Sequence, residues 1–128
     1  MIVVDASVAI NGLLTDGRAR RVMSEQDVAV PHLVDSEVTS ALRRLVRLDE
    51  LSAEDGERAV RRWQRLAVVR FSVTGLLDRV WELRDNVTAY DATYVAVAEA
   101  LDTELLTTDA RLAGATGPRC SITVLRPT

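Results

Sequence analysis

The chain contains no lysine, because all 16 of its basic residues are arginine. It also has a single cysteine, Cys120, and a single histidine, His32. One cysteine cannot form an internal disulfide, which fits a reducing compartment. One cysteine and one histidine also supply too few ligands for a conventional zinc site. Any bound metal would have to be held by oxygen atoms, and this favours magnesium or manganese.

Long apolar runs are absent as well. Every run is far shorter than the roughly 20 residues that a membrane-spanning helix needs, and no basic-then-apolar leader precedes the run that begins at Ile2. We therefore expect a cytoplasmic protein with no membrane contact. The 128 residues, 48% hydrophobic and 27% charged, fit one globular domain spanning residues 1–128.

The formal net charge of −3 gives no sign of a strongly basic nucleic-acid binder. A composition bias is the simplest explanation for the absence of lysine. Arginine nevertheless suits bidentate contacts to phosphate, and a modest overall charge can hide a local basic face.

Strand-like and helix-like segments alternate along the chain, without repeats or a Pro/Gly-rich linker. Apolar spacing and turn residues predict strands at 2–4, 28–30, 68–71, 104–106 and 122–125, and helices at 7–14, 18–24, 33–48, 52–66, 74–86 and 88–101. Strands separated by helices predict a parallel sheet with helices on both faces, which is an α/β fold. Ligands bind such sheets at the carboxyl ends of the strands.

Carboxylates stand at positions that a plain account of core and surface explains poorly. Asp5 ends the strand in "MIVVDAS", and Asp109 ends the strand in "ELLTTDARL". Glu37 and Asp91 fall on the apolar sides of their helices, where uncompensated burial of a charge is costly. The helix after Asp91 rises roughly 15 Å and the following strand returns by roughly 15 Å. Asp91 and Asp109 should therefore lie at the sheet edge where Asp5 stands.

Each acid also has a simpler interpretation. Asp5 and Asp109 could be helix N-caps, Thr88 and Asp91 match the form of a capping box, and Glu37 could be a rim residue with its head in water. Coincidence is the weaker explanation for four such acids at one edge of the sheet, because each would have to be buried at a cost.

Grouped carboxylates without lysine or histidine repel one another, and a divalent cation is the simplest remedy. Such a site can activate water and neutralise a phosphodiester, which predicts metal-assisted phosphoryl hydrolysis. The hydroxyls of Ser7, Thr107 and Thr108 could orient water or phosphate, or could equally well only satisfy turn backbone.

The segments "VVDASVAI", "VPHLVDSEVTSALRR", "AYDATYVAVAEAL" and "LLTTDARL", in this order, resemble the PIN-domain ribonucleases. At this short length the chain is most similar to the VapC toxins of toxin–antitoxin pairs, and the similarity spans the whole chain. The resemblance implies an α/β/α sandwich on a five-stranded parallel sheet. It also implies a homodimer and a small VapB-like antitoxin as partners.

The resemblance further implies a metal-dependent endoribonuclease that hydrolyses RNA and inhibits translation and growth. Asp5, Glu37, Asp91 and Asp109 would bind Mg²⁺ or Mn²⁺, with Asp109 often acting through water. Thr107 matches the hydroxyl residue two positions before the last acid in the family pattern.

Rival interpretations come from two classes. A receiver-like domain would need a lysine after a late strand, and Asp-x-Asp phosphatases would need an acid where Ser7 stands. A PIN-like binding module that has lost catalysis is the remaining alternative.

Other residues give no clear indication of a role at the acid site. Two predicted helices carry runs of arginine: Arg43, Arg44, Arg47, Arg58, Arg61, Arg62 and Arg65. Charge runs usually form solvated helix faces. Contact with RNA or with an antitoxin is the alternative here. Trp63, Phe71 and Trp81 are interpreted as core residues rather than base-stacking platforms, and His32 and Cys120 as structural.

Overall fold

The computed structural model describes residues 1–126, which contain one five-stranded parallel sheet. Its strands are β1 (Ile2–Val4), β2 (Val28–Pro31), β3 (Val68–Phe71), β4 (Leu105–Thr107) and β5 (Ile122–Val124). Their order across the sheet is β3-β2-β1-β4-β5, and every neighbouring pair is parallel. The predicted α/β class and five-stranded parallel sheet are confirmed.

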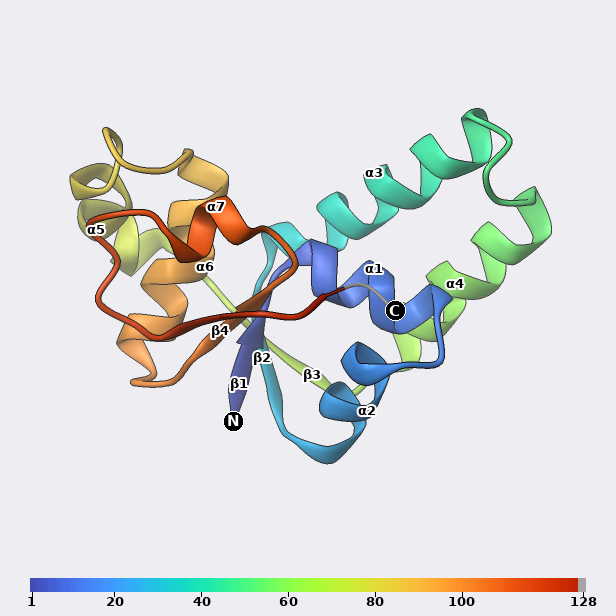
Figure 1. Cartoon of the computed structure of the whole chain (residues 1–128), viewed down its shortest axis with the longest axis horizontal. Helices are drawn as coiled ribbons and strands as arrows, with labels where there is room; N and C mark the ends of the chain where they lie inside the picture. Colours follow the sequence, from blue (N-terminus) through green and yellow to red (C-terminus); the bar gives the residue numbers. More distant parts are fainter. Residues whose placement is uncertain (127–128) are drawn as a thin grey trace.

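Helices cover both faces of this sheet. They are α1 (Ala6–Leu14), α2 (Arg18–Glu25), α3 (Leu33–Arg47), α4 (Ala53–Arg65), α5 (Leu77–Glu82) with the 3₁₀ turn η1 (Thr74–Leu76) before it, α6 (Ala89–Ala100) and α7 (Ala110–Ala113). α6 packs on β1 and β2 from one face together with α5, whereas α1 packs with α2, α3 and α4 on the other (Figure 1). Among residues 1–126, no helix combines the length and the apolar character that crossing a membrane requires.

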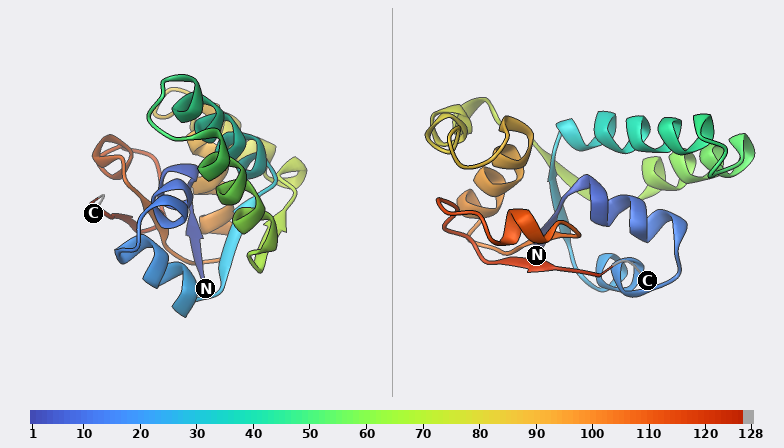
Figure 2. Two further views of the ribbon diagram at one scale, coloured as in Figure 1. Left: turned by 90° about the vertical axis from the view of Figure 1, so that its right-hand side faces the viewer. Right: turned by 45° about the horizontal axis from the view of Figure 1, so that its top comes forward.

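α3 and α4 form a helical hairpin that projects beyond the sheet, as both views in Figure 2 show. Ser52 begins α4 as predicted, because its hydroxyl accepts a hydrogen bond from the backbone N–H of Asp55 at 3.1 Å. The hairpin leaves the first turns of α3, rather than its far end, next to the sheet.

The helix predicted over 74–86 is much shorter. It begins as a 3₁₀ turn and ends at Glu82, after which the N–H groups of Asn86 and Val87 both bond to the carbonyl of Leu83. Asp and Asn compete with helical hydrogen bonding through turn conformations, so "DN" at 85–86 ends the helix early. The result is an irregular segment over 83–88 that leads directly into α6.

The strands and the inner faces of α1, α3 and α6 form the hydrophobic core. Val3, Val4, Val8 and Val95 are fully buried there. Buried on both faces, β1 is a continuous apolar run, as is usual for central strands of parallel sheets. Asp5 interrupts this apolar environment because it follows directly on β1.

The strand order changes direction between β1 and β4. From β1 the chain moves outward through β2 to β3, and it then returns to the other side of β1 to form β4 and β5. The helices leaving β1 and β4 therefore diverge at this point, which is where open α/β sheets bind ligands. Asp5 donates its backbone N–H to the carbonyl of Leu106 at 3.1 Å, so it lies beside the end of β4.

Candidate active site

Asp5 is the most firmly held acid at this edge of the sheet. It is 7% exposed, and its Oδ1 accepts hydrogen bonds from the Ser7 hydroxyl and the N–H of Val8. Its Oδ2 accepts the Thr107 hydroxyl at 2.5 Å. The cap interpretation of Asp5 is therefore correct, and it does not compete with a site, because Oδ2 accepts one hydrogen bond and keeps a second lone pair.

Thr107 connects the two strands that meet here. Predicted just beyond a strand, it is instead the last residue of β4, fully buried, with its side chain directed at Asp5. Its oxygen also accepts the N–H of Asp109 at 3.1 Å, and the Ser7 oxygen accepts the N–H of Thr108 at 3.0 Å. Thr107 and Ser7 thus hold the β4–α7 turn against the start of α1.

Glu37 projects from the second turn of α3 toward the same edge. Its Oε1 accepts the hydroxyl of Tyr94 at 2.5 Å. Burial raises the pKa of the Glu37 carboxyl, the Tyr94 hydrogen bond lowers it, and the negative charges of Asp5 and Asp91 raise it further. Burial also raises the pKa of the Tyr94 phenol, and its hydrogen bond to the charged Glu37 raises it further.

Asp91 lies in the first turn of α6, half-buried. Its N–H bonds to the Thr88 hydroxyl at 3.1 Å, so the cap predicted from Thr88 is present. Burial raises the pKa of the Asp91 carboxyl, and the charges of Asp5 and Asp109 raise it further. Asp5 and Asp109 follow separate strands, so the acids that act on Asp91 come from two parts of the sheet edge.

Asp109 is the outermost of the acids. It caps α7 by accepting the N–H of Arg111 at 2.9 Å, and the Arg111 side chain pairs with it at 3.3 Å. These bonds to Arg111 lower the pKa of the Asp109 carboxyl.

The five residues predicted for the site therefore gather at one edge of the sheet. Within residues 1–126, however, no three His, Cys, Asp or Glu side chains are close enough together to enclose a metal ion. Like-charged groups without a counter-ion repel one another, and Glu37 and Asp109 are each bonded to a separate side chain, Tyr94 and Arg111.

No arginine within the described residues forms an ion pair with Asp5, Glu37 or Asp91; the ion pairs there involve other acids. Two open depressions adjoin the acid cluster. One contains Glu37 and Arg44 beside α1, and the other contains Asp91 and Asp109 with Arg84 and Arg111. Ligands of extended shape can reach the acids from both.

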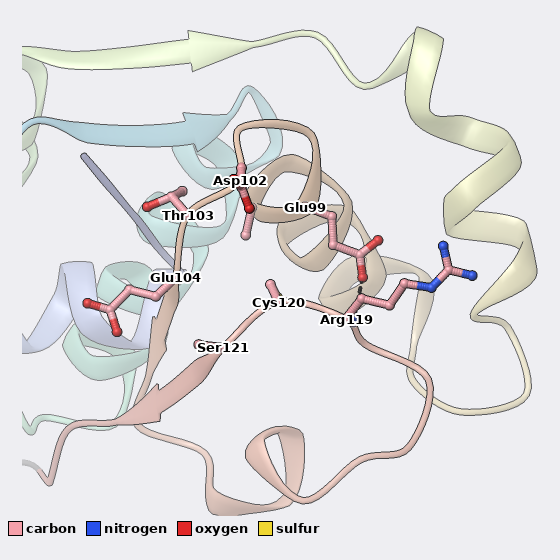
Figure 3. A pocket seen from close by; sticks show the side chains of 8 residues that line it. Glu99, Asp102, Thr103, Glu104, Arg119, Cys120 and Ser121 are labelled. Carbon is pink, nitrogen blue, oxygen red and sulfur yellow. Dashed lines mark hydrogen bonds between the residues drawn. The ribbon is translucent and has the colours of Figure 1, made fainter.

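Another depression lies at the opposite edge of the sheet, near the amino ends of β4 and β5. Figure 3 shows that Glu99, Glu104 and Cys120 surround it. Its central acid, Glu99, is paired with Arg79 at 2.7 Å and accepts the N–H of Arg119 at 2.7 Å. Burial raises the pKa of the Cys120 thiol, which disfavours a nucleophilic role.

Sequence reasoning missed Tyr94 as a site residue and misjudged Trp81. Tyr94 is one turn after Asp91 on the same helix face, and this spacing was the available signal. Trp63 is a core residue as predicted, at 4% exposed, whereas Trp81 is 68% exposed, so its assignment to the core was wrong. Val80 is the buried residue of α5, and Trp81, next to it, lies on another side of the helix.

The arginine runs on α3 and α4 are exposed as predicted. Arg58 pairs with Glu54, and Arg61 pairs with Glu57, each one turn away on the same helix. Exposed pairs of this kind on α4 contribute little to stability.

Comparison with known proteins agrees with this geometry. A family model described as "PIN domain" matches residues 2–117. This chain belongs to the PIN-domain family.

Within that family its relatives are VapC ribonucleases. Ribonuclease VapC9 of Mycobacterium tuberculosis is 54% identical over 125 residues, covering 98% of each chain. Ribonuclease VapC1 of the same species is 43% identical, covering 97% of each. The VapC resemblance inferred from the motifs is thereby confirmed.

Solved structures share the fold at low identity. PAE2754 from Pyrobaculum aerophilum has a TM-score of 0.72 at 22% identity, covering 94% of this chain and 81% of that one. A toxin–antitoxin complex from Klebsiella pneumoniae has a TM-score of 0.66 at 19% identity, covering 100% and 98%. Mycobacterium tuberculosis VapC20, described as a sarcin–ricin-loop-cleaving toxin, has a TM-score of 0.65 at 21% identity, covering 89% and 94%.

Proposed function

We propose that this protein is a metal-dependent endoribonuclease that acts as the toxin of a toxin–antitoxin pair. The observation that carries the proposal is the gathering of Asp5, Glu37 and Asp91 at the β1/β4 switch point without an arginine partner. The full-length similarity to VapC ribonucleases supports the same activity.

The donor set fits a hard divalent cation. Every candidate ligand is a carboxylate oxygen, and Mg²⁺ and Mn²⁺ prefer such ligands. Burial, and then the neighbouring acids, raise the pKa values of Glu37 and Asp91, so a bound cation would relieve unfavourable negative charge there. Asp5, Asp91, Glu37 and Asp109 would hold the ion, which when bound lowers the pKa of water and neutralises charge on the phosphodiester.

The protein's own contribution is orientation. Thr107 and Ser7 each donate a hydroxyl to Asp5 and so fix the plane of its carboxylate. Tyr94 does the same for Glu37. Because Tyr94 is 1% exposed and packed in the core, it holds Glu37 at one place on the rim. Carboxylates that are already oriented lose little entropy when a ligand binds.

The direct test is cleavage of a single-stranded RNA by the purified protein in Mg²⁺ or Mn²⁺. We expect Asp91→Asn to abolish cleavage, because it removes a charged oxygen ligand, and excess EDTA to do the same, because it removes the cation. Asp16→Asn, at an exposed turn between α1 and α2, is the matched control and should cleave normally. Undiminished cleavage by Asp91→Asn, or in excess EDTA, would refute the metal site.

A cytoplasmic toxin of this kind needs restraint, and we expect a small VapB-like antitoxin to supply it. An arginine of the antitoxin would satisfy the unpaired carboxylates through charge-assisted bonds. The depression beside Glu37, with Ile10, Leu45 and the exposed Leu48, provides apolar contacts for a partner helix. Co-expression of this antitoxin should restore the growth of cells that produce the toxin, and persistent growth arrest with both proteins present would contradict this partner.

Association of two copies belongs to the same proposal. A homodimer is expected from the resemblance to VapC toxins, and sedimentation at micromolar concentration tests it. A mass of about one chain, or about 14.1 kDa, at all concentrations would reject the dimer.

A further inference from the structure

We propose that the groove containing Asp91 and Asp109 is a nucleotide subsite. Arg84 and Arg111, which line it, would bind the RNA backbone, and Trp81, which lies beside the groove against Arg84, would stack on a base. This inference rests on the proposed ribonuclease function and assigns a path for the RNA strand on one side of the acids. None of these three residues was predicted from the sequence to take part in the site.

The groove lies between the irregular segment 83–88 and α7. Its lining includes Asn86, Thr88, Asp91, Asp109 and Leu112, and its volume is about 510 Å³. That volume is within the range of roughly 300–1,000 Å³ that small-ligand clefts occupy. Because Asp91 and Asp109 belong to both, the groove is continuous with the proposed cleavage site.

Hydrogen bonds connect the two walls of this groove. The Asn86 amide donates to the Thr116 hydroxyl at 3.0 Å, and the Arg79 guanidinium donates to the carbonyl of Gly117 at 2.9 Å. Gly117 has φ +107°, and a Cβ there would lie 3.2 Å from the Asn86 side chain. The segment after α7 thus approaches 83–88 closely enough to keep the groove's shape without a ligand.

Both arginines of the groove have donors available to a ligand. Arg111 is 93% exposed at the side chain and contacts only Asp109 at 3.3 and 3.5 Å. Arg84 donates one N–H to the carbonyl of Trp81 at 3.0 Å and forms no ion pair within residues 1–126. A negatively charged strand that approaches clustered carboxylates requires positive charge beside them, and these two side chains provide it.

Trp81 adds a stacking surface to this charge. The Arg84 guanidinium lies over the indole, 4.7 Å from the ring centroid, and the indole remains 68% exposed. An exposed aromatic ring combined with an arginine plane is the pattern with which proteins bind single-stranded nucleic acid, since every base has a π-face. The pairing favours RNA over a peptide, because an acidic peptide would use the arginines and leave the indole in water.

A comparison with the arginines of α4 supports RNA as the ligand of this groove. Arg58 and Arg61 are as basic as Arg84, but each is paired with an acid on its own helix. The depression that they line with Arg62 and Arg65 does not include any of the four site acids.

The test uses a short fluorescent single-stranded RNA and the full chain. For Arg84→Gln and Trp81→Leu we expect KM to rise about 5–20-fold with kcat changed less than about threefold, because phosphate and stacking contacts position the strand without joining the reaction. Arg21→Gln, at an exposed site on α2, is the matched arginine control. Circular dichroism verifies the fold of each variant.

Binding without cleavage is measured in the Asp91→Asn background. Arg84→Gln should weaken RNA affinity there by a similar factor, and the slope of log K against log[salt] should fall by about 0.7 for each lost phosphate contact. Because Trp63 is buried, RNA should quench fluorescence mainly from Trp81. Arg111→Gln should add a second loss, and Arg111→Lys should restore part of it.

The outcomes separate this subsite from the function on which it depends. If the wild type cleaves RNA while Arg84→Gln and Trp81→Leu keep normal KM and affinity, the subsite is wrong and the ribonuclease stands. If the wild type neither cleaves nor binds RNA, both are wrong. If Trp81→Leu changes only the sedimentation of the protein, this face is an interface between copies, and the subsite is again overturned.

Discussion

Two helices of this protein each carry one acid at the candidate site and another acid paired with arginine. On α3, Glu37 faces Asp5 and Asp91, whereas Asp35, two residues earlier, binds Arg70 at 2.7 Å. On α6, Asp91 faces the site and Glu99, two turns later, binds Arg79 at 2.7 Å.

The pKa shifts of the two groups have opposite signs. The carboxyl pKa values of Glu37 and Asp91 are raised, chiefly by burial. The pKa of Asp35 is lowered, chiefly by its bond to Arg70. Burial acts to raise the pKa of Glu99, but its bonds to Arg79 and the N–H of Arg119 together outweigh burial and lower it. The same residue types on the same helices thus stabilise the fold in one place and impose a cost in the other. Such uncompensated charge is typical of functional sites.

The largest expected effect separates catalysis from folding. Asp91→Asn should lower kcat/KM for RNA by about 1,000-fold, equivalent to about 4 kcal/mol at 1.36 kcal/mol per tenfold, while the protein stays folded. Glu99→Gln should keep cleavage within about twofold although it lowers the melting temperature. RNA cleavage assays and thermal unfolding of both variants test the comparison. Equal loss of cleavage in the two variants would contradict it.

The next effect concerns the arginine pair itself. Arg79→Gln should lower the free energy of unfolding by about 2–3 kcal/mol, because it leaves Glu99 without its partner. The side chains of Arg79 and Glu99 are 19% and 15% exposed. Glu82→Gln removes the exposed partner of the same arginine and should cost less than about 0.5 kcal/mol. Urea unfolding measures both values, and similar values would mean that burial of the Glu99 pair adds nothing.

Addition of a divalent cation should act on the site acids alone. With Mg²⁺ at about ten times its Kd, the gain in the free energy of unfolding is about 1.4 kcal/mol, because only the folded protein gathers the ligands. Asp5→Asn combined with Asp91→Asn should lose this gain, and Glu99→Gln should retain it. Differential scanning fluorimetry with and without Mg²⁺ measures the shift. A full shift in the double variant would place the ion elsewhere.

The smallest effect is a stabilisation of the protein without metal. Glu37→Gln and Asp91→Asn should each raise the free energy of unfolding at pH 7 by up to about 1 kcal/mol, since they remove mutual repulsion. The Glu37→Gln variant should keep the hydrogen bond from Tyr94, because an amide oxygen also accepts. Asp5→Asn should show no gain, because its two oxygens accept three hydrogen bonds and an amide cannot replace all of them.

This gain in the free energy of unfolding depends on pH, and the directions of the pKa shifts determine whether it grows or shrinks. A raised carboxyl pKa means that the folded state favours the protonated form, so the advantage of Glu37→Gln and Asp91→Asn should shrink as the pH falls toward about 4. The lowered pKa of Glu99 gives the reverse: its stabilisation is present above the ordinary Glu pKa and is lost as the pH falls. Unfolding at pH 7, 5.5 and 4 tests both, and parallel profiles would contradict the assignment.

The sequence by itself determined the order of the elements and the identity of the acids. Apolar runs and caps placed β1, α4 and α6 within about one residue, because the caps at Ser52 and Thr88 are local interactions. The positions of Asp5 and Asp109 after strands, and of Glu37 and Asp91 on apolar helix faces, required only periodicity. The absence of lysine and the scarcity of histidine limited the metal chemistry to oxygen ligands.

Only the tertiary structure decided which strands are neighbours and which acids receive an arginine. The pairing of β1 with β4 brings Thr107 onto Asp5 across 102 positions, and no local rule specifies it. The bond from Tyr94 to Glu37 and the pairs of Asp35 with Arg70 and Glu99 with Arg79 are likewise contacts between separate elements. The exposure of Trp81 depends on which side of α5 packs against α6, whereas hydrophobic spacing alone placed that side chain in the core.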